Sequence, residues 1–306
     1  MTEQKGAQTP TEDPRNHDVL ISLNGKLVRR AEALVSVFDA GFGLGDGVWE
    51  GLRLSHGRLI AIEDHLKRLY EGARTIAIDI GLKPSELRAR IDETLAANGM
   101  RDGVHIRLMV TRGEKTTVHQ DPRNALGRPT IVIVAEHKLP DPEVKRRGLT
   151  LATSTFRCSG PDVFDLRLNS HSRLNLIQAL LQAIACGAHE ALMLDPAGFV
   201  GSCNSTNFFI VRDGEVLTST GRFNFKGITR GKVIALAREH GIACRETDFT
   251  LAETYNADEA FVTGTFGGVT AAVKIDGRPI GSGSVGPVTQ HLSDIYDAAF
   301  LQPHPG

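Results

Sequence analysis

The sequence predicts a mixed fold of the α/β or α+β class, divided into two domains. Strand and helix patterns alternate through both halves of the chain, and 306 residues are enough for two cores. A hydrophobic fraction of 41% is typical of a globular protein that buries a core. A segment at 138–148 separates the halves, because it holds two prolines and a Lys-Arg-Arg cluster without apolar periodicity. We therefore expect a disordered tail at 1–17, a small α/β domain at 18–137, a linker at 138–148 and a larger domain at 149–306.

The first half begins with a hairpin signal. Asn24-Gly25 separates two β-forming runs, and this dipeptide favours a tight turn because both residues adopt positive φ readily. A glycine-rich segment follows, and apolar residues then recur at helical spacing. Pro84 opens a second helix that stops before Gly99. The expected strands are 19–28 with its internal turn, 48–54, 104–111 and 130–135, and the expected helices are 64–76 and 84–98.

The second half repeats the alternation of short β-forming runs with longer helical patterns. Such alternation again indicates a sheet that packs against helices. The expected strands are 149–155, 191–194, 208–211 and 259–263, and the expected helices are 174–186, 229–240 and 287–300.

Composition excludes several classes of function. The formal net charge is −1 and basic residues are scattered, so we expect neither a nucleic-acid nor a membrane partner. The four cysteines form no C-x-x-C pair, which argues against a zinc site and fits free thiols in a reducing compartment. The polar start of the chain lacks the apolar stretch of a signal peptide. We expect a cytoplasmic protein without a metal.

Three short motifs are candidates for anion binding. GITRG at 227–231 precedes a predicted helix, whose free N–H groups attract anions; the alternative is a loop in which Thr229 caps the helix. TGTFGG at 263–268 offers two hydroxyls and flexible backbone; the alternative is a plain turn. In HLKR at 65–68, Arg68 suits a phosphate; the alternative is an exposed helix residue.

Taken together, these motifs resemble those of the class IV (fold type IV) pyridoxal-phosphate family. This family includes branched-chain aminotransferases, D-amino-acid aminotransferases and aminodeoxychorismate lyase. The resemblance extends from about residue 19 to residue 300 in matching order and spacing. The motifs that carry it are GDGVWEG at 45–51, HLKRL at 65–69, GAHEA at 187–191, STN at 205–207, GITR at 227–230, ADE at 257–259, TGT at 263–265, IDGRPI at 275–280 and GPV at 286–288.

The resemblance implies a two-domain, D-amino-acid aminotransferase-like fold with pyridoxal phosphate in the cleft, and a homodimer whose partner helps to close the site. It also implies an amino donor and a keto acid as substrates. The cofactor-binding positions that it implies are Arg68, Ile228, Thr229, Gly264, Thr265, Ser202 and Asn207.

The sequence departs from the family at the lysine that normally holds the cofactor. That lysine stands three or four residues before the asparagine that matches Asn175, where this chain has His171 and Ser172, followed by Arg173. The chemistry needs a neutral primary amine to form a Schiff base. An arginine stays protonated and is a poor nucleophile, whereas a histidine can still carry a proton.

Two further departures concern the cofactor ring and the substrate. The family places a glutamate at the pyridine nitrogen, where this chain has Ser202, so we expect a weaker electron sink. D-amino-acid aminotransferases hold the substrate carboxylate with a tyrosine, an arginine and a histidine, which correspond here to Trp49, Thr117 and His119. Arg107 matches an arginine of the branched-chain enzymes and is expected either to bind a carboxylate or to lie on the surface of a strand.

The resulting hypothesis is an aminotransferase-like protein that binds pyridoxal phosphate, either without a covalent bond or as pyridoxamine phosphate, with His171 as proton carrier. Lys226, beside the proposed phosphate turn, is the candidate substitute for the missing lysine; the alternative is a solvated loop residue. Two rival hypotheses remain. One is a lyase similar to aminodeoxychorismate lyase, and the other is a non-catalytic or cofactor-independent binding protein on the same fold.

Overall fold

The computed structural model describes residues 6, 7, 9, 10 and 12–303. The chain divides into two compact units, which are considered one at a time. We call the first the N-terminal unit; it comprises Glu12–Leu139 and Leu168–Arg173. The C-terminal unit comprises Pro140–Arg167, Leu174–Gly306 and the start of the chain, Met1–Thr11.

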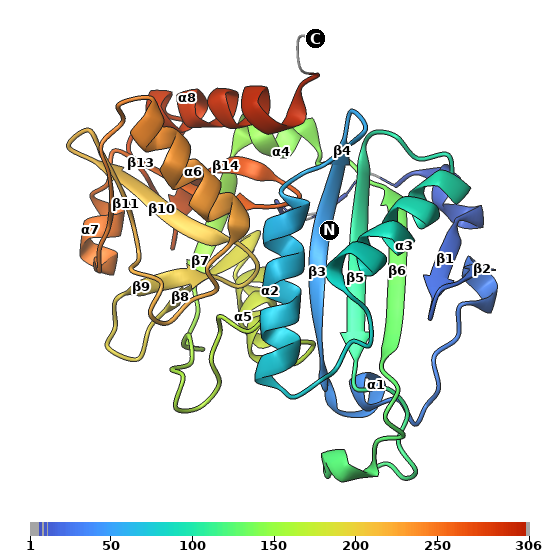
Figure 1. Ribbon diagram of the computed structural model, residues 1–306. Helices are drawn as coiled ribbons and strands as arrows, with labels where there is room; N and C mark the ends of the chain where they lie inside the picture. The colour runs from blue at the N-terminus through green and yellow to red at the C-terminus, as the bar shows by residue number, and fades with distance from the viewer. Residues whose placement is uncertain (1–5, 8, 11, 304–306) are drawn as a thin grey trace. The chain divides into compact units, whose positions relative to one another are not determined.

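The N-terminal unit is built on a six-stranded antiparallel sheet with the strand order β2-β1-β6-β5-β3-β4 (Figure 1). Asn24 and Gly25 adopt the positive φ values of 52° and 82° that the hairpin between β1 and β2 requires. The strands are β1 (Leu20–Leu23), β2 (Lys26–Arg29), β3 (Gly47–Ser55), β4 (Arg58–Leu59), β5 (Val104–Thr111) and β6 (Thr130–His137).

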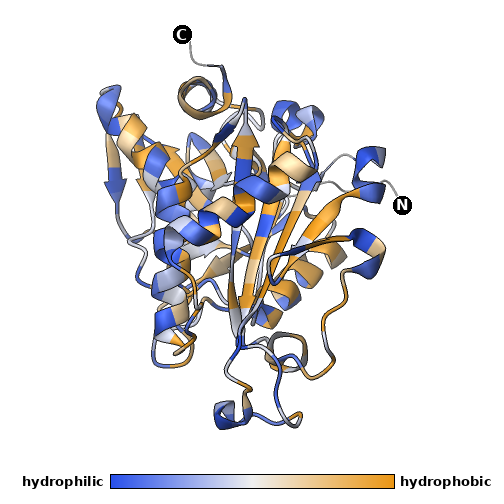
Figure 2. Cartoon of the chain, turned by 45° about the vertical axis from the view of Figure 1, so that its right-hand side comes forward, coloured by the Kyte–Doolittle hydropathy of each residue, from blue (hydrophilic) through white to orange (hydrophobic). Residues whose placement is uncertain are grey.

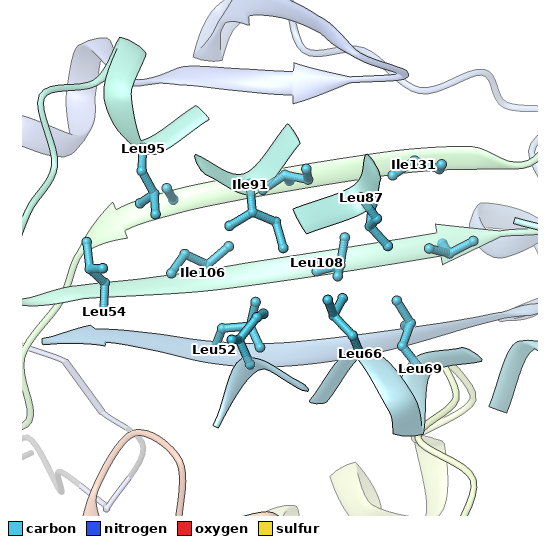
Figure 3. Close-up of a cluster of buried hydrophobic side chains, with 14 of the residues drawn as sticks. Leu52, Leu54, Leu66, Leu69, Leu87, Ile91, Leu95, Ile106, Leu108 and Ile131 are labelled. Atoms are coloured by element: carbon cyan, nitrogen blue, oxygen red, sulfur yellow. The ribbon is translucent and has the colours of Figure 1, made fainter. Parts of the chain in front are cut away.

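Two helices, α2 (Ile62–Thr75) and α3 (Pro84–Ala97), lie on the same face of this sheet (Figure 1). Their apolar side chains pack with those of β3, β5 and β6 in one core (Figure 3). Full burial of each such side chain contributes about 1.5–3 kcal/mol, so this layer fixes the position of β3. The residues labelled in that core are Leu52, Leu54, Leu66, Leu69, Leu87, Ile91, Leu95, Ile106, Leu108 and Ile131.

The C-terminal unit contains a nine-stranded mixed sheet with the order β12-β11-β10-β13-β14-β7-β8-β9, and β15 pairs with β14. The pairs β11–β12, β14–β7 and β7–β8 are parallel and the others are antiparallel. The strands are β7 (Leu149–Thr153), β8 (Glu190–Leu194), β9 (Val200–Cys203), β10 (Asn207–Arg212), β11 (Glu215–Thr218), β12 (Cys244–Glu246), β13 (Glu259–Gly264), β14 (Gly268–Ile275) and β15 (Arg278–Pro279). The helices are α4 (Pro142–Arg147), α5 (Leu174–Ala185), α6 (Ile228–Glu239), α7 (Leu251–Tyr255) and α8 (Pro287–Tyr296).

The predicted α/β (α+β) class is confirmed, and every strand and helix expected from the sequence is present within a few residues of its expected ends. The structure adds elements that the sequence does not predict, among them the four-residue strands β9 and β11 and the eight-residue strand β14. The expected linker at 138–148 contains α4, which begins at Pro142 with Asp141 as its cap. The glycine-rich segment likewise contains the short helix α1 (Ala40–Leu44).

The described end of the expected tail is ordered. Residues Pro14–Asp18 form a short 3-10 helix. Asn16 exchanges two hydrogen bonds with the backbone of His137, at 2.8 and 2.7 Å. The residues 1–5, 8 and 11 of the expected tail lie outside the described part of the chain.

Hydropathy follows the secondary structure. The strands are coloured mostly as hydrophobic in Figure 2, whereas the helices alternate between hydrophilic and hydrophobic residues. This pattern is typical of sheets covered by helices that have one face in water. Across the described residues, every helix is too short or too polar to cross a membrane.

Candidate active site

The segment 168–173 is fastened to β3 in the N-terminal unit like an additional short strand. Trp49 N–H donates to the Asn169 carbonyl at 3.0 Å, and His171 N–H donates to the Gly47 carbonyl at 2.9 Å. The indole N–H of Trp49 donates to the Ser170 carbonyl at 3.0 Å. This pairing fixes the backbone of the segment that the resemblance aligns with the cofactor-binding lysine.

His171 packs against Gly47, where an added Cβ would lie 2.9 Å from the imidazole Cδ2. Its Nε2 lies 3.2 Å from the Val48 carbonyl oxygen. A carbonyl only accepts, so in the neutral ring Nε2 carries the proton and Nδ1 holds a lone pair. Burial lowers the pKa of His171, and the nearby charges of Arg107 and Arg173 lower it further. The neutral imidazole is therefore a proton acceptor at Nδ1.

Ser172 and Arg173, which follow His171 in the chain, have different surroundings. Ser172 is exposed, and its hydroxyl donates to the Gly45 carbonyl at 3.2 Å. Arg173 is half-buried and donates to Asn169 Oδ1 at 2.7 Å. Neither side chain offers a primary amine, so the segment provides a base and a cation instead of a nucleophile.

Two guanidinium groups lie over the single indole ring of the chain. The Cζ of Arg107 is 3.8 Å and the Cζ of Arg173 is 5.0 Å from the centre of the Trp49 ring. Burial lowers the pKa of both arginines, and that of Arg173, which the charge of Arg107 also lowers, falls to about 10. Arg107, expected either to bind a carboxylate or to lie on the surface of a strand, is half-buried on β5, opposite Gly51.

Arg68 forms a buried ion pair. Its Nε and Nη2 donate to the two carboxylate oxygens of Glu50 at 2.7 and 2.6 Å, and His65 Nδ1 lies 2.7 Å from Glu50 Oε2. Burial by itself would raise the pKa of Glu50, but the hydrogen bonds from Arg68 and His65 outweigh it and lower the pKa. The exposed-helix alternative for Arg68 is wrong, since its side chain is only 18% exposed.

Thr117 and His119 are exposed in the loop between β5 and β6. His119 Nδ1 accepts a hydrogen bond from Asp121 N–H at 3.1 Å, and its carbonyl accepts one from the buried Lys115. Trp49 and Arg107, by contrast, are half-buried on paired strands. The four residues expected to bind substrate therefore occur in two different environments.

In the C-terminal unit, α6 begins without a side-chain cap. Its N-cap residue is Gly227, and the first bond of its ladder runs from Gly231 N–H to the Gly227 carbonyl at 3.1 Å. The N–H groups of residues 228–230 therefore precede the ladder. The alternative in which Thr229 caps the helix is wrong, because Thr229 lies inside the first turn.

Asn207 connects the loop before α6 to β10. Its Nδ2 donates to the Phe225 carbonyl at 2.6 Å, and its Oδ1 accepts from Gly227 N–H at 3.1 Å. An added Cβ on Gly227 would lie 2.3 Å from that Oδ1, so the position requires glycine. Asn207 thus orients the start of α6.

Ser202 is buried on β9, and its hydroxyl donates to the Thr206 carbonyl at 2.8 Å. It also lies 3.3 Å from Asn207 Nδ2, which donates to it. Because its single proton is engaged, Ser202 can accept from a ring N–H but cannot supply a negative charge.

Gly264, the last residue of β13, and Thr265, the first residue of the turn to β14, are both half-buried. The preceding Thr263 has a buried hydroxyl oxygen with no hydrogen-bond partner among the described residues. Lys226, by contrast, is exposed, and its aliphatic stem folds against Gly221, where an added Cβ would lie 2.6 Å from Lys226 Cε.

The residues of the C-terminal unit fit a B6 phosphate ester. The uncapped start of α6, the glycine at 227 and the Thr263 hydroxyl suit a phosphate. Ser202, the residue expected beside the pyridine nitrogen, offers a hydroxyl oxygen as an acceptor in place of a carboxylate. Sequence reasoning gave no role to Gly47 or Asn169, because the pairing of the 168–173 segment with β3 leaves no local signal. Thr263, by contrast, is one of the two hydroxyl residues of the motif at 263–268 that the sequence already indicated.

The comparisons with known proteins agree with this geometry. The model of the class IV amino-transferase family matches residues 47–275. "Branched-chain-amino-acid aminotransferase-like protein 1" of Arabidopsis thaliana is 38% identical over 92% of this chain, which spans 51% of that longer protein. D-alanine aminotransferase of Bacillus licheniformis is 33% identical, over 92% of this chain and 97% of its own length.

Solved structures give the same result. A branched-chain amino acid aminotransferase from T.th., solved with pyridoxamine 5'-phosphate, superposes with a TM-score of 0.87 at 32% identity, over 94% of this chain and 96% of its own. The enzyme of Thermoproteus uzoniensis with norvaline superposes with a TM-score of 0.83 at 30% identity, over 91% of this chain and 93% of its own. The chain therefore belongs to the class IV aminotransferase family, whose enzymes use pyridoxal phosphate.

Proposed function

We propose that the chain binds pyridoxal phosphate or pyridoxamine phosphate without a covalent bond and transfers an amino group between an amino acid or amine and a keto acid. The observation that carries the proposal is the start of α6, where three N–H groups precede the helical ladder and no side chain caps them. Such an end attracts a dianion through its N–H groups and its dipole.

The phosphate contacts that we propose are the N–H groups of Ile228 and Thr229, together with the turn at Gly264 and Thr265. The buried hydroxyl of Thr263 supports this assignment, because a buried oxygen without a partner is costly unless a ligand satisfies it. We retain Arg68 as a further expected contact; its two donations to Glu50 orient the guanidinium. Ser202 is the expected neighbour of the ring nitrogen.

His171 is proposed to move the proton. When bound, the cofactor supplies a carbonyl group that accepts an amine and a ring that withdraws electrons. His171 Nδ1 holds a lone pair, since Nε2 lies beside the Val48 carbonyl. Because the pKa of His171 is lowered, its ring stays neutral at pH values somewhat below 6.5, the ordinary pKa of histidine. The acidic limb of a pH–activity profile is therefore expected below pH 6.5.

A spectroscopic titration tests the binding claim. Added pyridoxal phosphate is expected to saturate the full-length protein and to be removed by dialysis. Borohydride treatment followed by peptide mapping is expected to give no adduct on lysine. An adduct on Lys226 would contradict the non-covalent part of the proposal, and failure of any B6 compound to bind would contradict the whole of it.

The turnover claim has a matched pair of variants. His171→Ala removes the proton acceptor and is expected to abolish amino transfer while B6 binding stays within about threefold, because His171 contacts no phosphate in this assignment. His171→Lys restores an amine in the segment 168–173 and is expected to give a borohydride-trapped adduct at position 171. Amino transfer that survives in His171→Ala would argue against the assigned role.

A non-catalytic binding protein is the second candidate. The replacement of the family lysine by a histidine and a hydrogen-bonded serine favours it, because neither forms a stable covalent bond to the cofactor. It predicts reversible B6 binding and no consumption of a keto acid with any donor. Product analysis over a panel of amines and amino acids separates the two candidates.

We propose Trp49 and Arg107 as substrate contacts on the N-terminal unit. The T.th. enzyme has been solved complexed with N-(5'-phosphopyridoxyl)-L-glutamate, at a TM-score of 0.86 and 32% identity to this chain. An acidic substrate suits the guanidinium of Arg107. The exposed positions of Thr117 and His119 suit a contact with a second subunit.

A homodimer is the expected assembly. The helix α5 exposes an apolar stripe at helical spacing, and Leu174 and Leu181 in it are 68% and 59% exposed. The N-terminal unit exposes Leu34 and Phe42 at 77% and 73%. We propose that a second copy covers these surfaces, which sedimentation of the full chain tests. All four cysteines are free, which suits the expected cytoplasmic location.

A further inference from the structure

A cavity of about 650 Å³ lies in the N-terminal unit, where the pairing of β1 with β6 ends. Within the described residues, these two strands pair only at Ser22 and Leu23 of β1. The N–H and the carbonyl of Leu20 bond instead to the side chain of Asn98, at 2.7 and 2.9 Å. The two strands therefore diverge, and the volume that they leave is typical of small-molecule sites.

Three regular elements hold the lining of this cavity in place. Asn98, which binds Leu20, is the C-cap residue of α3. Arg29 is the last residue of β2 and pairs with Leu20 in the hairpin. His137 is the last residue of β6, and its backbone exchanges two hydrogen bonds with the Asn16 side chain. The cavity is therefore formed by the backbone of the fold rather than by the positions of loose side chains.

Two opposite charges line the cavity without pairing. They are the carboxylate of Asp18 and the guanidinium of Arg29. Within the described part of the chain, neither forms an ion pair or a side-chain hydrogen bond. Arg15, a third charged residue of the lining, is already paired with Asp13 at 2.6 Å. The cavity thus offers one anion and one cation to a ligand that carries both charges.

Other groups of the lining complement such a ligand. Nδ1 of His137 is buried and has no hydrogen-bond partner among the described residues, which is costly unless a ligand or a water satisfies it. The helix α3 ends at Ala97 on the cavity, and the carbonyl end of a helix favours a positive charge. Val19 and Met100 are buried side chains of the lining and add an apolar surface.

We propose that this cavity binds a free α-amino acid with an apolar side chain. Arg29 donates to the carboxylate, Asp18 and the end of α3 receive the ammonium group, and the hydrocarbon packs on Val19 and Met100. A free amino acid carries both charges on one carbon, whereas the residue at either end of a peptide carries only one of them. The site shares no residue with the proposed cofactor and substrate contacts, so the inference does not depend on the proposed function.

Methionine NMR tests the site directly. Of the four methionines in the chain, Met100 is the one that lines the cavity. We would titrate the full-length protein, carrying isotope-labelled methionine methyl groups, with L-leucine. The Met100 methyl signal is expected to shift until it saturates. Met109 alternates with Arg107 on β5 and lies on the same face as that residue, so its signal reports binding at the proposed substrate contacts instead.

Two analogues of leucine separate its charges. Isocaproate lacks the ammonium group and isopentylamine lacks the carboxylate, and each is expected to bind at least about tenfold more weakly than leucine. Asp18→Asn is expected to weaken leucine binding about tenfold and to leave isocaproate binding unchanged. Arg29→Gln is expected to weaken binding of both but not of the amine. Lys26→Gln, at an exposed lysine of the same strand as Arg29, is the matched control and is expected to change none of the affinities.

The outcomes are distinguishable. Asp18 and Arg29 are exposed, so both variants are expected to fold, which circular dichroism checks. Equal affinities of the parent for leucine and isocaproate would overturn the inference, and this arm needs no variant. A leucine titration that shifts Met109 while Met100 stays constant would also overturn it and would leave the proposed function standing. A saturable Met100 shift in a protein that binds no B6 compound would sink the proposed function alone.

Discussion

The helices α6 and α8, in the same unit, both begin with N–H groups that lie before the helical ladder, but these groups have different partners at the two helices. Each helix has glycine as its N-cap residue, at Gly227 and Gly286, and neither glycine supplies a capping side chain. At α8 the carboxylate of Glu259 accepts from Val288 N–H at 2.9 Å and Thr289 N–H at 2.7 Å. At α6 the amide of Asn207 takes only Gly227 N–H, outside the helix.

The difference separates a helix start that an internal carboxylate satisfies, at α8, from one that has only a neutral amide beside it, at α6. At both glycines an added Cβ would collide with the neighbouring side chain, at 2.1 Å from Glu259 at Gly286 and 2.3 Å from Asn207 at Gly227. Close approach is therefore common to both ends, but only α8 receives a negative charge from the described part of the chain. A neutral amide positions the α6 turn and leaves its N–H groups for an anion from outside.

The largest effect is expected from removing the internal anion. In Glu259→Gln one carboxylate oxygen becomes an amide nitrogen, which cannot accept from the helix N–H that it faces. The unfolding free energy of the variant is therefore expected to be lower than that of the parent by about 3 kcal/mol. Urea denaturation measures this loss. Glu215→Gln is the control, because Glu215 pairs with Arg245 on the exposed surface, and it is expected to cost under about 0.5 kcal/mol. Equal stability of Glu259→Gln and the parent would show that the two helix ends do not differ in the way described.

A second buried glutamate extends the comparison to a carboxylate with fewer donors. Glu190 accepts from Thr206 Oγ1 at 2.6 Å, its Oε1 has no partner among the described residues, and burial raises its pKa from 4.5 to about 7. The folded state then keeps a proton that the unfolded chain releases. Its contribution is therefore complete below pH 4.5 and is lost as the pH rises toward about 7.

The loss attributable to Glu190 is expected to be about 2 kcal/mol. Denaturation of the parent at about pH 5 and about pH 8 measures the total change, and Glu190→Gln is expected to remove this part of it. An identical pH dependence in parent and variant would contradict the raised pKa of Glu190.

Sequence reasoning predicted regular elements better than it predicted contacts. Periodicity and glycine signals found α2, α3 and the Asn24-Gly25 hairpin, because these depend on neighbours along the chain. Short strands such as β9 and β11 carry too few residues for a period of two to be recognised. The helix α4 was not predicted because its exposed residues are mostly charged and only one of its residues, Val144, is buried, so it shows no apolar periodicity.

The candidate site shows the same division. The motif at 227–231 indicated an anion site on local grounds, and the position expected for the lysine came from the resemblance alone. The stacking of Arg107 and Arg173 on Trp49 depends on the register of β3 with β5 and on the pairing of 168–173 with β3. No spacing in the sequence predicts that these three side chains contact one another, since the residues are separated by tens of positions.

The smallest and most specific effect is expected at the start of α6 itself. Gly227→Ala forces Asn207 away from the turn, so pyridoxal phosphate affinity is expected to fall about tenfold, or about 1.4 kcal/mol. Gly231→Ala is the matched control in the same helix, because an added Cβ there meets no atom within 4 Å. It is expected to stabilise the fold by about 0.5–1 kcal/mol without changing affinity. Absorbance titration and thermal unfolding of both variants separate binding from stability. Equal affinities in the two would remove the distinction between an α6 start that awaits an anion and an α8 start that already has one.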